Sequence, residues 1–207
     1  MANNTRIPDV AIKRLPIYLR VLRELQEEEV EIVSSAELSE RTGFSSEQIR
    51  KDLAYFGAFG TRGVGYRTDL LSRRIMKILG LDRVVRVAVV GAGNLGTALA
   101  RYNLRRYPEL EIAAVFDNDW DKIGKRIEDL EILPMEDLPR VVAERGITMG
   151  IIAVPPRAAN EVARQLVAAG IRAILNFSPV KLNVEDGVHV HNIDLSIELQ
   201  SLPVEQN

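Results

Sequence analysis

A glycine-rich turn between a strand-like run and a helix-like run constrains the fold of this chain more than any other feature. Residues 84–90 read VVRVAVV, and the turn that follows them is Gly91-Ala92-Gly93-Asn94-Leu95-Gly96. Residues 97–102 then have helical character. In such a turn the first glycine allows a tight bend, the second lets a pyrophosphate approach the backbone, and the third lets the helix pack close to the strand. The turn therefore predicts a dinucleotide site, with the phosphates at the helix N-terminus.

An acidic residue follows at the position where a ribose ligand is expected. Asp117 lies 21 residues beyond Gly96, directly after a second strand-like run at 112–116. A carboxylate there suits the 2′-hydroxyl of NAD and repels the 2′-phosphate of NADP. The alternatives are a glycine-rich turn without a ligand, and an aspartate that only caps a helix or a turn.

The pattern from residue 81 onward alternates between strand and helix. Strand-like runs cover 84–90, 111–116, 147–154 and 172–177, with a shorter one near 188–190, and helix-like runs cover 94–107, 135–145 and 157–169. This predicts an α/β fold, a doubly wound Rossmann domain over residues 81–190.

Two strand ends of this predicted domain carry further candidate ligand contacts. We expect Val154, Pro155 and Phe177 to form an apolar pocket for a nicotinamide ring, with Ser178 beside it. The Asn176 amide is expected to bind the carboxamide of that ring. The alternative is that these residues only end their strands.

Residues 1–80 have the pattern of a winged helix-turn-helix domain. A first helix is indicated by Ile12, Leu15, Leu19, Leu22 and Leu25, although Pro16 predicts either a kink or a helix that begins near it. Two short helices follow within 34–43 and 45–56, with serines to cap them and Gly43 to end the first. Residues 57–66 contain four glycines, as a tight hairpin would.

Charge supports a polyanion-binding role for this region. Residues 41–80 contain eight Lys or Arg against three acidic residues, in a chain whose net charge is −2. We expect helix 46–55 to enter the major groove of DNA and the hairpin to touch phosphates or the minor groove. The alternatives are a plain helical hairpin and an ordinary basic surface. The candidate DNA contacts are Ser46, Gln48, Arg50, Lys51, Tyr55, Arg62 and Gly63.

Several function classes are excluded by what the sequence lacks. It has no cysteine, which rules out disulfides, thiolate metal sites and thiol chemistry. Its two histidines, His189 and His191, stand without a third metal ligand or a catalytic partner in the pattern. No substrate domain remains beside the nucleotide domain, so we expect no catalytic residues, no metal and no enzyme activity. No apolar run approaches membrane-spanning length, which predicts a cytoplasmic protein without a membrane partner.

The chain resembles the Rex family of redox-sensing transcriptional repressors over nearly its whole length. The segments that carry the resemblance are the glycine-rich turn together with AIKRLP at 11–16, QIRKDLAYFG at 48–57, GTRGVGY at 60–66 and ILNFSP at 174–179. The resemblance implies a homodimer that binds double-stranded DNA at A·T-rich inverted-repeat operators. It also implies NADH and NAD+ as sensed ligands, with DNA released when NADH rises relative to NAD+.

The resemblance further implies a role for the tail at 191–207, in which a C-terminal helix swaps onto the partner subunit. Pro203 would stop that helix early. It also implies a switch that involves Arg14, Tyr102 and Asp194. Two alternatives remain for the function: a small NAD-dependent oxidoreductase, and a regulator that senses another nucleotide such as coenzyme A, which Asp117 disfavours.

Overall fold

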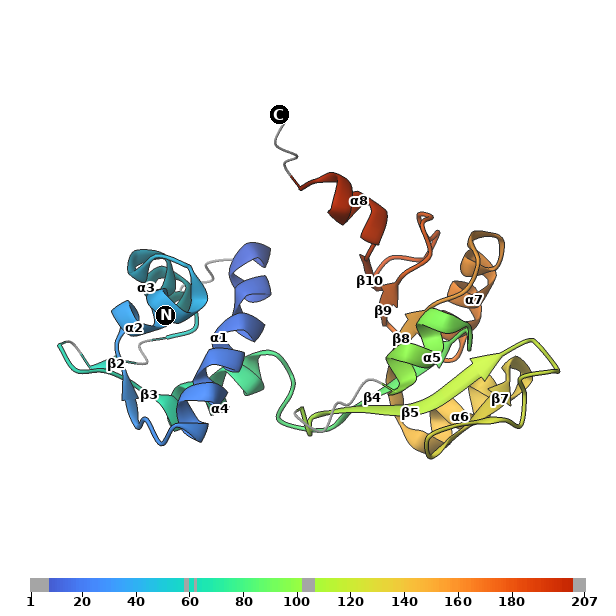
Figure 1. The fold of residues 1–207 in the computed structure, drawn as a ribbon, viewed down its shortest axis with the longest axis horizontal. Helices are drawn as coiled ribbons and strands as arrows, with labels where there is room; N and C mark the ends of the chain where they lie inside the picture. The colour runs from blue at the N-terminus through green and yellow to red at the C-terminus, as the bar shows by residue number, and fades with distance from the viewer. Residues whose placement is uncertain (1–7, 58–59, 62, 102–106, 203–207) are drawn as a thin grey trace. The chain divides into compact units, whose positions relative to one another are not determined.

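The computed structural model describes residues 8–57, 60–61, 63–101 and 107–202, and it divides the chain into two units (Figure 1). The first unit is Met1–Arg83 and the second is Val84–Asn207. The sequence predicts the boundary after residue 80 and a separate tail from residue 191. In the structure that tail is part of the second unit, because its first residues form a strand of the unit's sheet.

Four helices form most of the first unit: α1 (Asp9–Glu27), α2 (Ser35–Thr42), α3 (Ser46–Tyr55) and α4 (Thr68–Ile78). The predicted caps are confirmed, since Ser34 Oγ accepts a hydrogen bond from the Glu37 N–H at 3.1 Å and Ser45 Oγ accepts one from the Gln48 N–H at 3.2 Å. Gly43 ends α2 in the left-handed conformation, with φ at 75°.

The first helix differs from one of the two expectations for it. It begins at Asp9 and continues through Pro16, so a start near Pro16 is wrong. Pro16 cannot donate to the carbonyl of Ile12. Both residues are exposed, so water can satisfy that carbonyl and the helix tolerates the proline.

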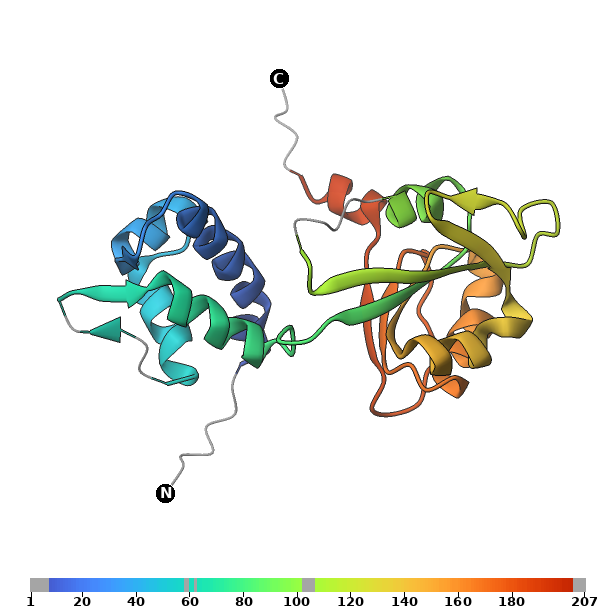
Figure 2. The same ribbon diagram turned by 90° about the horizontal axis from the view of Figure 1, so that it is seen from below.

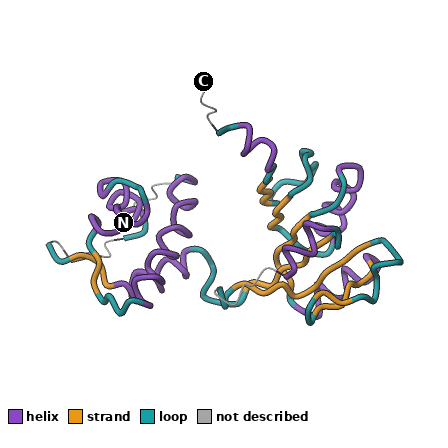
Figure 3. The backbone as a smooth tube through the Cα atoms, in the orientation of Figure 1, coloured by secondary structure: helices purple, strands orange, loops and turns teal. Residues whose placement is uncertain are grey.

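A small antiparallel sheet completes the first unit. Figure 3 draws its strands in orange and the helices in purple. The predicted hairpin is present as β2 (Gly60–Thr61) and β3 (Gly65–Arg67). The strand order β1-β3-β2 includes β1 (Ile32–Val33), which the sequence did not predict because two residues are too few to show an alternating pattern.

The second unit is built on a seven-stranded sheet in the order β10-β9-β8-β4-β5-β7-β6. Every pairing is parallel except that of β6 with β7, which confirms the doubly wound arrangement. The β6–β7 hairpin was not predicted. The strands are β4 (Val85–Val90), β5 (Leu110–Asp117), β6 (Arg126–Ile127), β7 (Leu130–Pro134), β8 (Ile147–Ile152), β9 (Ala173–Asn176) and β10 (His189–Asn192).

Helices cover both faces of this sheet (Figure 2). On β4, Val87 and Val89 pack in the cluster that includes residues of α5 (Asn94–Arg101), whereas Ala88 and Val90 pack with α6 (Leu138–Arg145) and α7 (Pro156–Ala168). A 3-10 turn, η2 (Met135–Asp137), precedes α6, and α8 (Leu195–Gln200) ends the described chain. The predicted helix 94–107 is described only to Arg101, because residues 102–106 lie outside the described residues.

A buried carboxylate joins α1 to α3 in the first unit. Asp52 is fully buried and accepts hydrogen bonds from Nε and Nη2 of Arg14, both at 2.6 Å, and from the Tyr18 hydroxyl at 2.6 Å. Gln48 Nε2 donates to it as well, at 2.8 Å. Burial alone would raise the pKa of Asp52, but the bonds from Arg14, Tyr18 and Gln48 outweigh it and the pKa lies below its ordinary value of 3.8. Asp52 is therefore ionised at neutral pH.

We predict that Asp52→Ala lowers the free energy of unfolding of the first unit by about 3–5 kcal/mol, because it leaves the Arg14 guanidinium without its partner. Tyr18→Phe, which removes one neutral donor and leaves Arg14 paired, should cost less, about 1.5–3 kcal/mol. Native-state hydrogen exchange of the amides of α1 and α3 measures both changes. Since the folded-state pKa of Asp52 is lowered, its contribution is full above the ordinary value of 3.8 and is lost as the pH falls through the lower folded-state value. Equal costs for the two variants would contradict this account of the pair.

Candidate nucleotide site and nucleic-acid surface

A cleft of about 450 Å³ opens at the carboxyl ends of β4, β5 and β8 in the second unit. This volume falls in the range of small-molecule sites, roughly 300–1,000 Å³. Parallel strands bring their carboxyl ends to one edge of the sheet, and the order reverses at β4, which is where such folds bind ligands. Five of the predicted contacts line the cleft, namely Gly91, Gly93, Asp117, Val154 and Pro155.

The three glycines of the turn have distinct surroundings, and those of Gly91 and Gly96 agree with the reasons predicted for them. Gly91 has φ at 103°, and a Cβ there would overlap the carbonyl oxygen of Ala153. A Cβ on Gly96 would overlap the carbonyl oxygen of Gly91, so α5 can pack against the turn only because residue 96 has no side chain. Gly93 is exposed, and a Cβ on it would meet no atom within 4 Å. The open space at Gly93 fits a pyrophosphate that approaches the backbone.

Three other residues of the predicted turn have different environments. Ala92 is buried, and its N–H is directed at Asp117 rather than outward. Asn94 and Leu95 are exposed in the first turn of α5, where backbone N–H groups favour an anion.

Asp117 holds the turn and its own loop together through its carboxylate. Oδ2 accepts from the Ala92 N–H at 2.7 Å and from Lys122 Nζ at 3.1 Å, while Oδ1 accepts from the Asp119 N–H at 2.8 Å. Burial would raise the pKa of Asp117, but the backbone bonds of Asp119 and Ala92 and the bond from Lys122 lower it below its ordinary value. The ionised carboxylate keeps an acceptor site on Oδ1 for a ribose hydroxyl.

Cationic side chains that the sequence analysis missed also line the cleft. Lys122 comes from the loop after β5, and Arg157 comes from the first turn of α7. The hydrogen bond to Asp117 raises the pKa of Lys122, so its charge is retained. Two features of the sequence could have indicated them: Lys122 follows Asp117 by five residues, and Arg157 directly follows the Pro155-Pro156 pair.

Asn176 has a role that differs from the expected one. It is fully buried, and its Nδ2 donates to the carbonyl oxygens of Ser178 and Val180 and to Asn192 Oδ1, at 3.0, 3.0 and 2.9 Å. Its Oδ1 accepts from the Ser178 N–H at 3.0 Å. These contacts use both amide hydrogens within the chain, so Asn176 shapes the loop after β9 and is not accessible to a ligand. Ser178 is likewise buried, and Phe177 is half-buried against the α5 side of the sheet.

The second candidate surface is the exposed face of α3, together with the hairpin. Arg50 and Lys51 are exposed on α3, and Ser46, Gln48 and Tyr55 are half-buried at its edges. Arg50 Nη1 donates to Ser35 Oγ of α2 at 2.8 Å, which directs its guanidinium along the helix pair. Gly63 is exposed in the turn of the hairpin, where the Val64 N–H donates to the Thr61 carbonyl at 2.9 Å. Arg62 lies outside the described residues.

The three residues of the predicted switch are not gathered within either unit. Arg14 is bound to Asp52 in the first unit. Asp194 caps α8 in the second unit, where its Oδ1 accepts from the Ser196 and Ile197 N–H groups at 2.9 and 3.3 Å. Tyr102 lies outside the described residues.

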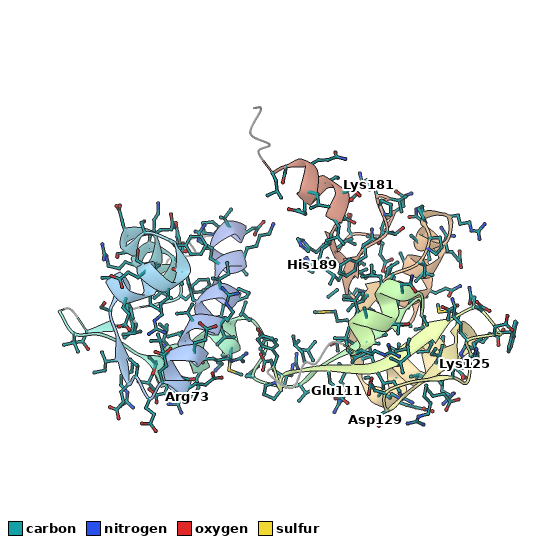
Figure 4. All side chains as sticks on the ribbon, viewed as in Figure 1. Arg73, Glu111, Lys125, Asp129, Lys181 and His189 are labelled. Atoms are coloured by element: carbon teal, nitrogen blue, oxygen red, sulfur yellow. The ribbon has the colours of Figure 1, made fainter. Side chains whose placement is uncertain are left out.

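The remaining titratable side chains form no further site in the part of the chain that the structure describes. His189 and His191 are exposed on β10, and Figure 4 labels His189 there. No group of three or more His, Asp or Glu side chains that could hold a metal occurs among the described residues. None of the described helices has the length and apolar content needed to cross a membrane.

Two family models match this chain. A model described as "Putative DNA-binding protein N-terminus" matches residues 6–54, and one described as "CoA binding domain" matches residues 82–180. The first match lies within the first unit, and the second covers most of the second unit.

Curated relatives are similar over nearly the whole chain. A "Redox-sensing transcriptional repressor Rex" of Natranaerobius thermophilus is 50% identical over 195 residues, which is 94% of this chain and 89% of that protein. The protein of the same name from Chloroflexus aurantiacus is 51% identical over 195 residues, or 94% of this chain and 92% of that protein.

Solved structures agree with these relatives. "RSP in complex with beta-NAD+ and operator DNA" has a TM-score of 0.88 and 39% identity, over 96% of this chain and 91% of that one. "RSP in complex with beta-NADH" has a TM-score of 0.83 and 37% identity, over 96% and 93% of the two chains.

The surroundings of Gly93 and Gly96 predict that their substitution affects different properties of the protein, NADH binding at Gly93 and stability at Gly96. Gly96→Ala should lower the free energy of unfolding by about 1–3 kcal/mol, because its Cβ would overlap backbone. Gly93→Ala should leave stability within about 0.5 kcal/mol but weaken NADH binding by roughly tenfold, because the methyl group fills the space meant for the pyrophosphate.

Thermal unfolding and an NADH titration separate these effects. Trp120, the single tryptophan, follows Asp117 by three residues and is 75% exposed, so its fluorescence can report binding. Unchanged NADH affinity in Gly93→Ala would show that the pyrophosphate does not lie at this position.

Proposed function

This chain belongs to the Rex family of redox-sensing transcriptional repressors, and from that premise we propose how its two units bind NADH, NAD+ and operator DNA. It is a transcriptional repressor and not an enzyme. The observation that carries the function is that one chain, similar over 96% of its length to a protein solved with both NAD+ and operator DNA, contains both a nucleotide cleft and a basic helix-turn-helix.

The nucleotide binds along the cleft of the second unit. Its pyrophosphate lies over Gly93 and the first turn of α5, and its adenosine ribose hydroxyls bind Asp117. The open position at Gly93 and the ionised carboxylate support this arrangement. A coenzyme A ligand, which the name of the matching family model would suggest, is less well suited, because the 3′-phosphate on its ribose would meet the Asp117 carboxylate.

Discrimination between the two redox forms follows from the charge on the nicotinamide ring. NAD+ carries a positive charge on the ring and NADH does not. A ring site that includes apolar side chains such as Val154 and Pro155, which line the cleft, penalises the charged form by desolvation, so it favours NADH. Phe177, which was expected in the same site, packs with the cluster on the α5 side of the sheet and is not among the residues that line the cleft.

Operator DNA binds to the first unit through α3 and the hairpin. The exposed Arg50 and Lys51 contact bases or phosphates in the major groove, and the hairpin around Gly63 reaches the minor groove. A glycine at the tip of the hairpin supports close approach to the DNA backbone, because it presents no side chain.

The protein acts as a homodimer on an A·T-rich inverted repeat, and its C-terminal helix contributes to the dimer. Leu195, Ile197, Leu199 and Leu202 are all at least 60% exposed in and just after α8. Four adjacent apolar side chains in contact with water are typical of a surface that a partner covers.

One form of the switch would have Asp194 pair with Arg14 in one state and accept a hydrogen bond from Tyr102 in the other. Pairing Arg14 with Asp194 would be costly. It would remove two donors from a fully buried carboxylate, at about 3–5 kcal/mol per subunit. Because of this cost, we propose that Arg14 stays on Asp52 and that Asp194 acts in the switch through other partners.

We predict that NADH releases the protein from its operator. Fluorescence anisotropy of a labelled inverted-repeat duplex should fall as NADH is added against a fixed concentration of NAD+, because NADH has the higher affinity for the free form. Coenzyme A at the same concentrations is the control and should leave the complex intact. Quenching of Trp120 by NADH without any release of DNA would contradict the proposal.

Arg50→Ala is predicted to weaken operator binding and to reduce the slope of log K against log salt by about one unit, as expected for loss of one phosphate contact. Arg140→Ala is the matched control, since Arg140 is an exposed arginine of α6 that is paired with Asp137 and Glu144. Anisotropy at several salt concentrations provides both slopes. Identical slopes for wild type and Arg50→Ala would exclude a phosphate contact by Arg50.

A further inference from the structure

We propose that Asp52 positions the Gln48 amide so that Gln48 reads an adenine in the operator, an inference that rests on the proposed role of α3 in the major groove. Gln48 and Asp52 are four residues apart on α3, so their side chains lie on one side of the helix. Gln48 Nε2 donates to Asp52 Oδ1 at 2.8 Å. Gln48 is half-buried, whereas Asp52 is fully buried, so only Gln48 can reach DNA.

The charge of Asp52 decides which way the Gln48 amide faces. Asp52 is ionised and can only accept hydrogen bonds, so the NH2 group of Gln48 must face it. One amide hydrogen is used in this contact. With the hydrogen trans to the carbonyl oxygen in this contact, the other hydrogen and the oxygen lie along one free edge of the amide and remain for another partner.

The free edge of Gln48 matches one base. In the major groove adenine offers an N6 amino group as a donor and N7 as an acceptor, which a glutamine amide binds with its oxygen and its N–H together. Guanine offers two acceptors, O6 and N7, and so does not match. Residues near the N-terminus of a recognition helix contact base edges, and Gln48 is the third residue of α3.

Residues of α1 hold Asp52 in this orientation. Arg14 donates to both carboxylate oxygens and Tyr18 donates to Oδ2. Arg14 also lies over the Phe44 ring, with its Cζ 5.8 Å from the ring centre, and Tyr18 contacts the same ring edge to face at 5.8 Å between centroids. The carboxylate therefore has a fixed position, and its hydrogen bond in turn fixes the orientation of the Gln48 amide. Asp52 is a positioning residue that does not itself touch the DNA.

The test begins with Gln48→Met, which keeps the length of the side chain but removes its amide. An inverted-repeat duplex is selected from random DNA by the wild-type protein, and each adenine is replaced in turn by 7-deazaadenine, by purine without its N6 amino group, or by guanine paired with cytosine. At one adenine per half-site, wild type should prefer A·T by about 5- to 150-fold and lose affinity with both analogues. Gln48→Met should be indifferent there. If it keeps the wild-type discrimination at every position, Gln48 does not read a base.

Asp52→Ala then tests the positioning role. It removes the acceptor of the Gln48 amide hydrogen, so the amide can turn and present either its oxygen or its N–H groups to a base. We expect the preference for A·T at that base pair to fall by about fivefold or more. Tyr18→Phe is the matched control: it also removes a bond from Asp52 but should keep the A·T preference.

Folding is checked by circular dichroism and by NADH affinity, which should equal that of wild type. Because Asp52→Ala leaves the Arg14 charge without its partner, the double variant Arg14→Met/Asp52→Ala, which removes both charges together, serves as the second test. Unchanged A·T preference in either folded variant would overturn the role of Asp52. Absence of sequence-specific binding by the wild-type protein would instead overturn the proposed function itself.

Discussion

The nucleotide cleft depends on the contact between the backbone of Gly91 and that of Ala153. Because position 91 carries no side chain, the end of β4 can lie directly against the end of β8, and Gly96 lets α5 close over the same turn. The Ala92 N–H then reaches Asp117 at the end of β5. Three strand ends are thus tied together before any ligand arrives, so the cleft is preorganised for the nucleotide.

In the first unit, a buried carboxylate holds two helices together, as the glycines hold the strand ends together in the second unit. Asp52 joins α1 to α3 through three side-chain hydrogen bonds, two from Arg14 and one from Tyr18, and it accepts a fourth from Gln48 on α3 itself. Its burial makes the loss of these donors costly. A recognition helix held in this way presents one fixed set of groups to DNA. The resemblance alone suggested a switch role for Arg14, whereas its contacts favour a role in holding the recognition helix.

Local patterns made much of this predictable from the sequence. The glycine turn, Asp117 and the ends of α3 follow from short-range rules, and all three lie where these rules indicate. Lys122, the burial of Asn176 and the Arg14–Asp52 pair depend on contacts between segments distant in sequence or on loop conformation, which a single sequence does not reveal. Strand β1 escaped prediction because its two residues are too few to show an alternating pattern and its pairing partner, β3, is distant in the sequence.

In a redox-sensing repressor, occupation of the nucleotide cleft and occupation of the DNA surface must be coupled. The most direct test measures the NADH dissociation constant of the free protein and of the protein saturated with its operator duplex. Thermodynamic linkage requires NADH to bind the DNA complex more weakly, by the same factor by which NADH weakens DNA binding. Equal NADH affinities for the two forms would contradict the account, since a ligand that does not distinguish the two states cannot shift the balance between them.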